Sequence, residues 1–81
     1  RAVAAHRAEA KMRYADAHEL AAEIRRKHPT ASARAFPIRG KHYQVSVKLP
    51  GWEYFQAFRT REGWEHAESR YHQTQRQAVS V

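Results

Sequence analysis

The sequence predicts a small α+β domain in which two helices pack on one face of a three-stranded antiparallel sheet. Three observations support this fold class. Residues 2–28 contain no Gly or Pro and nine Ala, as expected of a helix. Apolar residues then alternate with polar ones on both sides of a Pro-Gly pair, a pattern typical of a β-hairpin. A second helical face follows. With 81 residues, the chain has room for one core and one domain, residues 1–81.

The first helix is predicted over residues 1–28. It ends at His28 because a residue that precedes proline disfavours the helical conformation. Its apolar stripe is thin and starts only at Tyr14, continuing through Leu20 and Ile24. Residues 1–12 are polar on most faces, so we expect them to contribute almost nothing to the core. They would depend on a partner, on upstream chain, or on a second copy in a homodimer through this helix.

The sheet is predicted within residues 34–60, and its first strand is weak. Phe36 and Ile38 lie two residues apart and share a face, but Pro37 between them places the strand at an edge. Arg39-Gly40-Lys41 then indicates a turn.

Two stronger strands follow as an antiparallel hairpin. The apolar positions of the first are Tyr43, Val45, Val47 and Leu49, alternating with polar residues. Pro50-Gly51 is a tight-turn pair, and residues 52–60 form the second strand, with aromatic residues on both faces.

The last helix is predicted over residues 61–76. Thr60 can cap it, and Glu62 in its first turn suits the helix dipole. Trp64, Ala67 and Tyr71 then form the face that packs on the sheet. The polar tail from Gln73 is expected to fray. The second sheet face would be left free to meet a partner.

Composition excludes several classes of protein. No apolar run approaches the about 18 residues of a membrane span, and there is no cysteine for a disulfide scaffold or a Cys-based zinc site. Only 19 apolar residues are larger than alanine, too few for a large buried active site. We expect a cytoplasmic protein without a cofactor and without contact to a membrane. Because the chain starts with Arg1 and not Met, we expect a fragment of a longer chain.

Charge indicates the class of partner. There are 15 Lys and Arg residues against 8 Asp and Glu, giving a net charge of +7, and arginine dominates. Arginine binds phosphates through a planar fork, which favours nucleic acid as the partner. The candidate binding residues are Arg25, Arg26, Lys27, Arg34, Arg39, Lys41, His42, Gln44 and Lys48. Their basic members form one patch only if the end of the first helix lies near the Arg39–Lys41 turn; otherwise they are scattered surface charges.

The polar side of the central strand is a second candidate feature. Side chains on such a ribbon can read base edges in a DNA major groove, although they can equally form the hydrated face of an antiparallel sheet. Aromatic residues Trp52, Tyr54 and Phe55 can stack on single-stranded bases or serve in the core.

Catalytic and metal chemistry have weaker support. The six histidines are scattered without a His–His pair one helical turn apart, so no metal site is expected. Ribonuclease-like chemistry would need His42 beside a second titrating group, and Glu53 and Tyr54 could approach it across the Pro50-Gly51 turn. Nothing in the sequence fixes that geometry, and we expect the domain not to be an enzyme.

Two families resemble parts of this pattern. Residues 38–48, with a Gly-containing turn before Tyr-x-Val-x-Val, look like the second strand of the DNA-binding arm domains of phage integrases; the resemblance extends over residues 36–72. It implies a sheet that lies in the DNA major groove. The element order is also similar to double-stranded RNA-binding modules, but residues 61–65 carry two glutamates where those modules carry lysines.

Together these observations predict a non-catalytic nucleic-acid-binding domain of a phage or mobile-element protein, with DNA favoured over RNA. The alternative is a protein-interaction module, a small regulator or inhibitor that binds an acidic protein partner. The N-terminal half-helix and the two-faced aromatic strand motivate this alternative.

Overall fold

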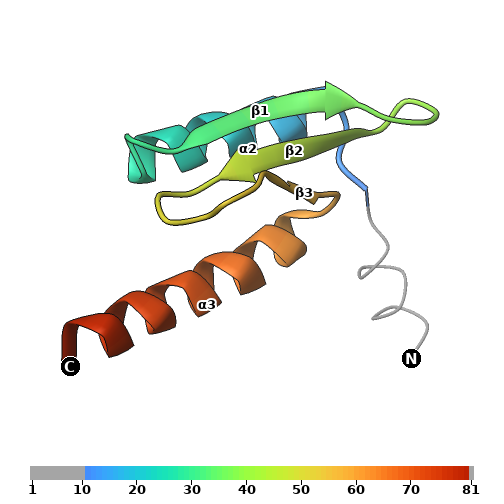
Figure 1. The fold of residues 1–81 in the computed structure, drawn as a ribbon. Coiled ribbons are helices and arrows are strands. Elements are labelled where there is room, and N and C mark those ends of the chain that lie inside the picture. Colours follow the sequence, from blue (N-terminus) through green and yellow to red (C-terminus); the bar gives the residue numbers. More distant parts are fainter. Residues whose placement is uncertain (1–10, 81) are drawn as a thin grey trace, which may run out of the picture.

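The computed structural model of the chain describes residues 11–80, and the side chains among them up to residue 75. The predicted fold class is confirmed, because helix, three antiparallel strands and helix follow one another (Figure 1). The sheet has the strand order β1-β2-β3. The elements are α2 (Tyr14–Lys27), β1 (Ser32–Pro37), β2 (Tyr43–Lys48), β3 (Gln56–Phe58) and α3 (Arg61–Ser80).

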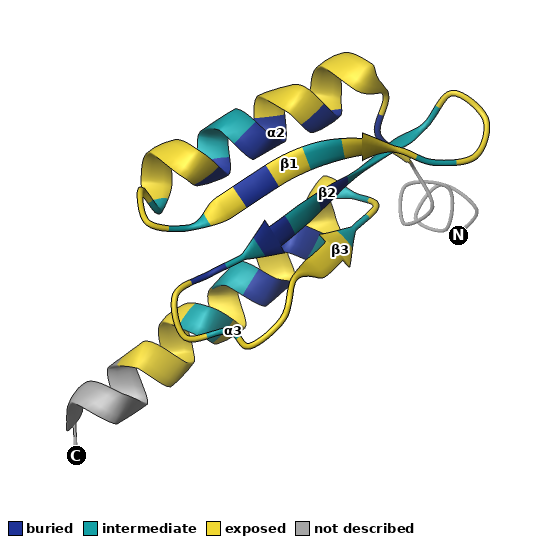
Figure 2. Cartoon of the chain, turned by 45° about the horizontal axis from the view of Figure 1, so that its top comes forward, coloured by how far each residue is buried: buried dark blue, intermediate teal, exposed yellow. Residues whose placement is uncertain are grey.

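Both helices cover the same face of the sheet. Register places Ala33 opposite Val47 and Ala35 opposite Val45, so these four side chains point to one side. The views in Figures 1 and 2 agree that α2 and α3 lie on that side, and the residues coloured as buried in Figure 2 line the space between helices and sheet. The largest fully buried side chains are Trp64, Leu20, Ile24, Leu49, Val45 and Val47.

Several predicted turns and caps are confirmed. Gly40 and Gly51 both have positive φ, +70° and +94°, as their two turns require. The backbone N–H of Gly63 donates to Thr60 Oγ1 at 3.0 Å, which caps α3. β1 is an edge strand, as Pro37 predicts. It starts at Ser32, two residues earlier than expected.

The helix predicted over residues 1–28 is confirmed from Tyr14 to Lys27 and is wrong at residues 11–13. The helix begins at Tyr14, and Arg13 before it is extended, with φ −92° and ψ 175°. Met12 instead forms an antiparallel bridge with Tyr43, whose N–H donates to the Met12 carbonyl at 2.8 Å. Tertiary pairing here outweighs the helix propensity of the segment.

The expectation that residues 1–12 contribute almost nothing to the core is therefore wrong at Met12, which is 6% exposed. Residues 1–10 lie outside the described residues, and so does the dimer contact predicted through them. In the described part of the first helix, the apolar stripe is already buried against the sheet. Its buried members are Ala17, Leu20, Ala21 and Ile24.

The predicted strand over residues 52–60 is also shorter than expected. Only Gln56–Phe58 pairs with β2. The Trp52 ring turns toward the helices and lies 6.5 Å from Phe58 and 6.2 Å from Tyr71, measured between ring centroids. The Trp52 side chain thus joins the aromatic packing on the helix side, and pairing with β2 begins only at Gln56.

The last helix begins at Arg61 as predicted and continues beyond the predicted end, to Ser80. Over the described residues, neither α2 nor α3 is long and apolar enough to cross a membrane.

An ion pair links the start of α3 to α2, with Arg61 Nη1 3.2 Å from Glu23 Oε1. Burial raises the pKa of the Glu23 carboxyl, but the hydrogen bonds and charges of Arg61 and then Lys27 outweigh burial and lower that pKa below its ordinary value. A carboxyl with a lowered pKa stabilises the fold above its unfolded-state pKa, and this stability is lost as the pH falls through the folded-state pKa.

We therefore expect Arg61→Gln to lower the free energy of unfolding near neutral pH, by no more than about 1 kcal/mol for a surface pair. The difference from wild type should vanish in acid, once Glu23 is protonated. Urea unfolding across a pH series measures it. The control is Arg59→Gln, an exposed neighbour outside this ion pair, and a pH-independent difference for Arg61→Gln would contradict the expectation.

Candidate functional site

The sheet face opposite the helices is covered by no described element, and we call it the open face. Alternation and register assign its residues. Arg34, Ser46 and Ala57 form its central row, Phe36 lies opposite Gln44, and Ser32 lies opposite Lys48. The polar residues predicted for a binding face, Gln44 and Lys48, are therefore on this surface.

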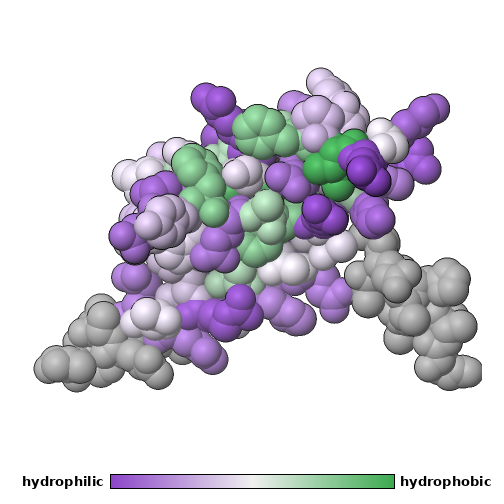
Figure 3. Space-filling view, turned by 45° about the vertical axis from the view of Figure 1, so that its right-hand side comes forward, coloured by the Kyte–Doolittle hydropathy of each residue, from purple (hydrophilic) through white to green (hydrophobic). Residues whose placement is uncertain are grey.

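Two exposed phenylalanines lie at the two edges of the sheet. Phe36 on β1 is 42% exposed. Phe55 directly precedes β3, two residues before Ala57, and is 52% exposed. From the side that Figure 3 presents, apolar side chains are interleaved with hydrophilic ones and form no single continuous patch. Exposed apolar side chains that are scattered singly are ordinary on a protein surface, so only their basic and polar neighbours on the sheet make these two rings of interest.

The excess of positive charge lies in the sheet segment and not in the two described helices. Residues 29–60 contain five basic residues and one acidic residue, a net charge of +4. None of the strands contains Asp or Glu. The acidic residues of the two described helices are Asp16, Glu19, Glu23, Glu62, Glu65 and Glu68. The same two helices carry six basic residues, so their net charge is zero. A polyanion approaching the domain is consequently attracted more strongly to the sheet segment than to the helices.

The predicted basic set is not one patch. The C-terminal end of α2 lies beside the start of β1, whereas the Arg39–Lys41 turn follows the other end of that strand (Figure 1). A six-residue strand separates the two by about 20 Å. Arg25 Nη1 donates to the Ala33 carbonyl at 2.7 Å, and Lys27 pairs with Glu23 at 3.4 Å. The side chains of Arg25 and Lys27 are thus already bonded within the domain, to β1 and to α2.

The structure also separates the aromatic residues after the turn, and it separates His42 from Glu53. Of the aromatic cluster after the turn, Trp52 packs with the core, whereas Tyr54 is 73% exposed. His42 is half-buried and directly precedes β2, while Glu53 follows the turn beyond the opposite end of that strand. The structure therefore does not bring His42 to Glu53, and the geometry needed for ribonuclease-like catalysis by this pair is not formed.

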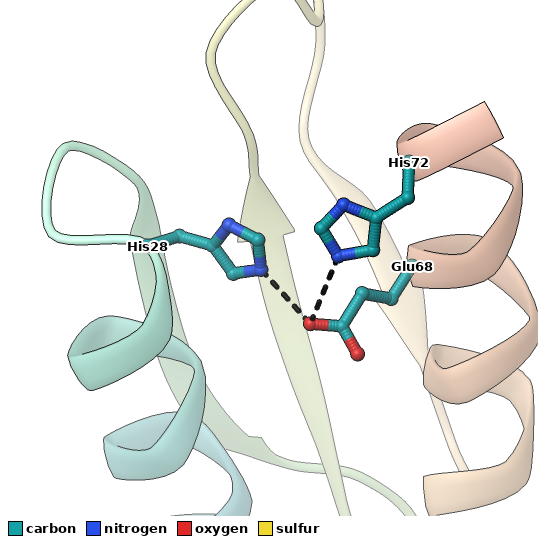
Figure 4. A group of neighbouring side chains, drawn as sticks. All are labelled: His28, Glu68 and His72. Atoms are coloured by element: carbon teal, nitrogen blue, oxygen red, sulfur yellow. Dashed lines mark hydrogen bonds and ion pairs between the residues drawn. The ribbon is translucent and has the colours of Figure 1, made fainter. Parts of the chain in front are cut away.

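A further cluster, His28, Glu68 and His72, was not predicted. The Nε2 atoms of His28 and His72 both point at Glu68 Oε2, at 2.9 and 4.0 Å (Figure 4). Histidine spacing does not reveal this cluster, because its two histidines lie far apart in the sequence. The Glu68–His72 spacing of one helical turn was the available signal, but it could not show that His28 lies beside it.

Comparison with protein-family models, with curated proteins and with solved structures finds no significant match to this chain. Function therefore has to be argued from the surfaces themselves.

Proposed function

We propose that this domain binds nucleic acid without catalysis, and that the open face holds a single-stranded segment. The observation that carries the proposal is the placement of two exposed phenylalanines, Phe36 on β1 and Phe55 directly before β3, at the edges of a sheet. The strands of this sheet carry Arg34 and Lys48 on the open face and contain no Asp or Glu. Exposed aromatic rings set among cations are the combination that single-strand binders use.

Each group on the open face has a role in this proposal. Arg34 and Lys48 neutralise phosphates, which releases counterions and makes the affinity depend on salt. The rings of Phe36 and Phe55 each stack on a base, an interaction typically worth about 1–3 kcal/mol. Gln44, on the central strand, can donate to and accept from a base edge.

The spacing of the two rings suggests the path of the strand. Phe36 and Phe55 belong to opposite edges of the sheet, so two inter-strand steps of about 4.8 Å separate them across it. They also lie near opposite ends of the strands. A bound single strand would therefore cross the sheet diagonally, passing the cations on its way.

A duplex is the less favoured ligand, although the resemblance to integrase arm domains implies one. Paired bases cannot stack on a protein ring without being unstacked first, so exposed phenylalanines suit unpaired bases better. DNA stays ahead of RNA as the ligand, because the glutamates at the start of α3 depart from the lysines of double-stranded RNA-binding modules.

The test is fluorescence anisotropy with a labelled single-stranded oligothymidylate across a salt series. Wild type should bind at low salt, with an affinity that falls as salt rises. Phe36→Ala and Phe55→Ala should each weaken binding by about tenfold, because each removes one stacking platform without changing charge.

Charge variants give the matched control. Arg34→Glu on the open face and Arg26→Glu on α2 change the net charge equally, and both positions are exposed. Only Arg34→Glu should abolish binding. An equal loss for both would show that the attraction is not localised to the sheet, and no binding at low salt would remove the proposal.

An acidic protein partner is the second candidate, because the same surface offers cations and exposed aromatic rings. A labelled polyglutamate peptide presents the charges without bases. Binding of this peptide as tight as that of the oligonucleotide, with the same loss in Phe55→Ala, would favour the protein partner. Weaker binding of the peptide, unaffected by Phe55→Ala, would favour nucleic acid.

A further inference from the structure

We propose that His28, Glu68 and His72 bind a divalent transition metal ion, best suited to Zn²⁺. This site lies on the helix side of the sheet and is independent of the open face and its proposed function. Two imidazoles and one carboxylate, with one position left for water, are a ligand set that zinc uses in proteins.

The distances between the ligand atoms are close to what zinc needs. With bonds of about 2.0–2.1 Å, tetrahedral ligand atoms lie about 3.4 Å apart. In the structure, Glu68 Oε2 is 2.9 Å from His28 Nε2 and 4.0 Å from His72 Nε2, and all the ligand atoms lie within 4.8 Å of one another. A small side-chain movement would equalise them, and His72, whose side chain is 52% exposed, is free to make it.

The fold positions the other two ligands. His28 caps α2, with its N–H donating to the Ile24 carbonyl at 2.8 Å. Its ring meets Trp64 and Tyr71 nearly at right angles, each at 6.1 Å between centroids, so aromatic packing holds it in place. The side chains of His28 and Glu68 are only 12% and 16% exposed. The site is thus largely formed before a metal arrives, which reduces the cost of binding.

The orientation of the imidazoles fits a shared cation. The rings of His28 and His72 are stacked, 5.8 Å apart and 29° from parallel, and both turn Nε2 toward one carboxylate oxygen (Figure 4). That oxygen has two lone pairs and can accept a hydrogen bond from each ring, but only when both Nε2 atoms carry a hydrogen. A metal ion between them accepts a lone pair from both rings and from the carboxylate.

Metal binding would have a structural consequence. His28 ends α2, whereas Glu68 and His72 belong to α3. Glu68 lies 40 positions after His28 in the sequence. One ion would therefore cross-link two helices that are distant in sequence. Since such a site does not exist in the unfolded chain, the ion should stabilise the fold by mass action.

The experiment uses the full chain with Zn²⁺ alone, by isothermal titration calorimetry and thermal unfolding. We expect one ion per chain and a midpoint of unfolding that rises with Zn²⁺ concentration. His72→Ala should weaken binding by more than about tenfold, since losing even an outer-shell partner costs that much. His72 is exposed, so this variant should remain folded.

His66→Ala is the matched control, because His66 is an exposed histidine of α3 outside the cluster. It should leave both the affinity and the Zn²⁺-dependent shift unchanged. Glu68→Gln tests the carboxylate, and Co²⁺ in place of Zn²⁺ gives a visible spectrum that reports a tetrahedral set. Absence of one-to-one binding, or equal loss in His72→Ala and His66→Ala, would overturn the proposal.

Discussion

Replacing Trp64 by alanine should leave the domain barely folded at room temperature. Trp64 is 1% exposed and is the largest fully buried side chain. Its ring packs edge-on against Phe58 at 5.6 Å and against His28 at 6.1 Å, so it joins α3, β3 and the end of α2. Trp→Ala in a core costs about 3–5 kcal/mol, a large part of the about 5–15 kcal/mol that stabilises a typical domain.

Urea unfolding followed by far-ultraviolet circular dichroism measures this loss without relying on tryptophan fluorescence. Tyr54→Ala is the control, since it also removes a large aromatic ring, but from a residue that is 73% exposed. That variant should stay within about 0.5 kcal/mol of wild type. Equal midpoints for the two variants would mean that α3 does not pack on the sheet through Trp64.

The element order could be predicted because its signals are local. Alternation from Tyr43 onward fixes which side of β2 is buried, since a strand turns successive side chains to opposite faces. Pro50-Gly51 and the Thr60 cap act within a few residues of themselves. Each of these features depends on neighbours in sequence, and each appears in the structure where the pattern puts it.

The errors concern features that depend on distant residues. Helix propensity extends the first helix through Met12, but pairing with Tyr43, across the sheet, gives this segment an extended conformation. The approach of His28 to Glu68 likewise requires α2 and α3 to pack together, although all three strands lie between these helices in the sequence. No local pattern carries that information.

The candidate binding residues show the same limit. Whether Arg25 and Arg39 share a patch depends on which end of β1 meets the end of α2. A short connection joins the end of α2 to β1, so the C-terminal end of α2, with Arg25, lies beside the start of β1. The turn with Arg39 is then necessarily at the far end. Once the topology is known, the candidate binding surface is the open face of the sheet and not the basic end of α2.

The second large effect is expected from Met12→Ala. Met12 is 6% exposed and belongs to the core cluster, although its neighbours Lys11 and Arg13 are exposed. Truncating a buried Met to Ala costs about 2–5 kcal/mol. Alanine keeps the backbone carbonyl that accepts from Tyr43 N–H, so the loss reports the side chain and not the bridge. Urea unfolding of the full chain measures it.

Two further variants make the result specific. Lys11→Ala alters the adjacent exposed residue and should change the free energy of unfolding by less than about 0.5 kcal/mol. Met12→Leu keeps a similar volume and should recover most of the loss, to within about 1.5 kcal/mol of wild type. A Met12→Ala variant as stable as Lys11→Ala would show that the segment before α2 does not reach the core, because removal of a buried side chain cannot be neutral in a core this small.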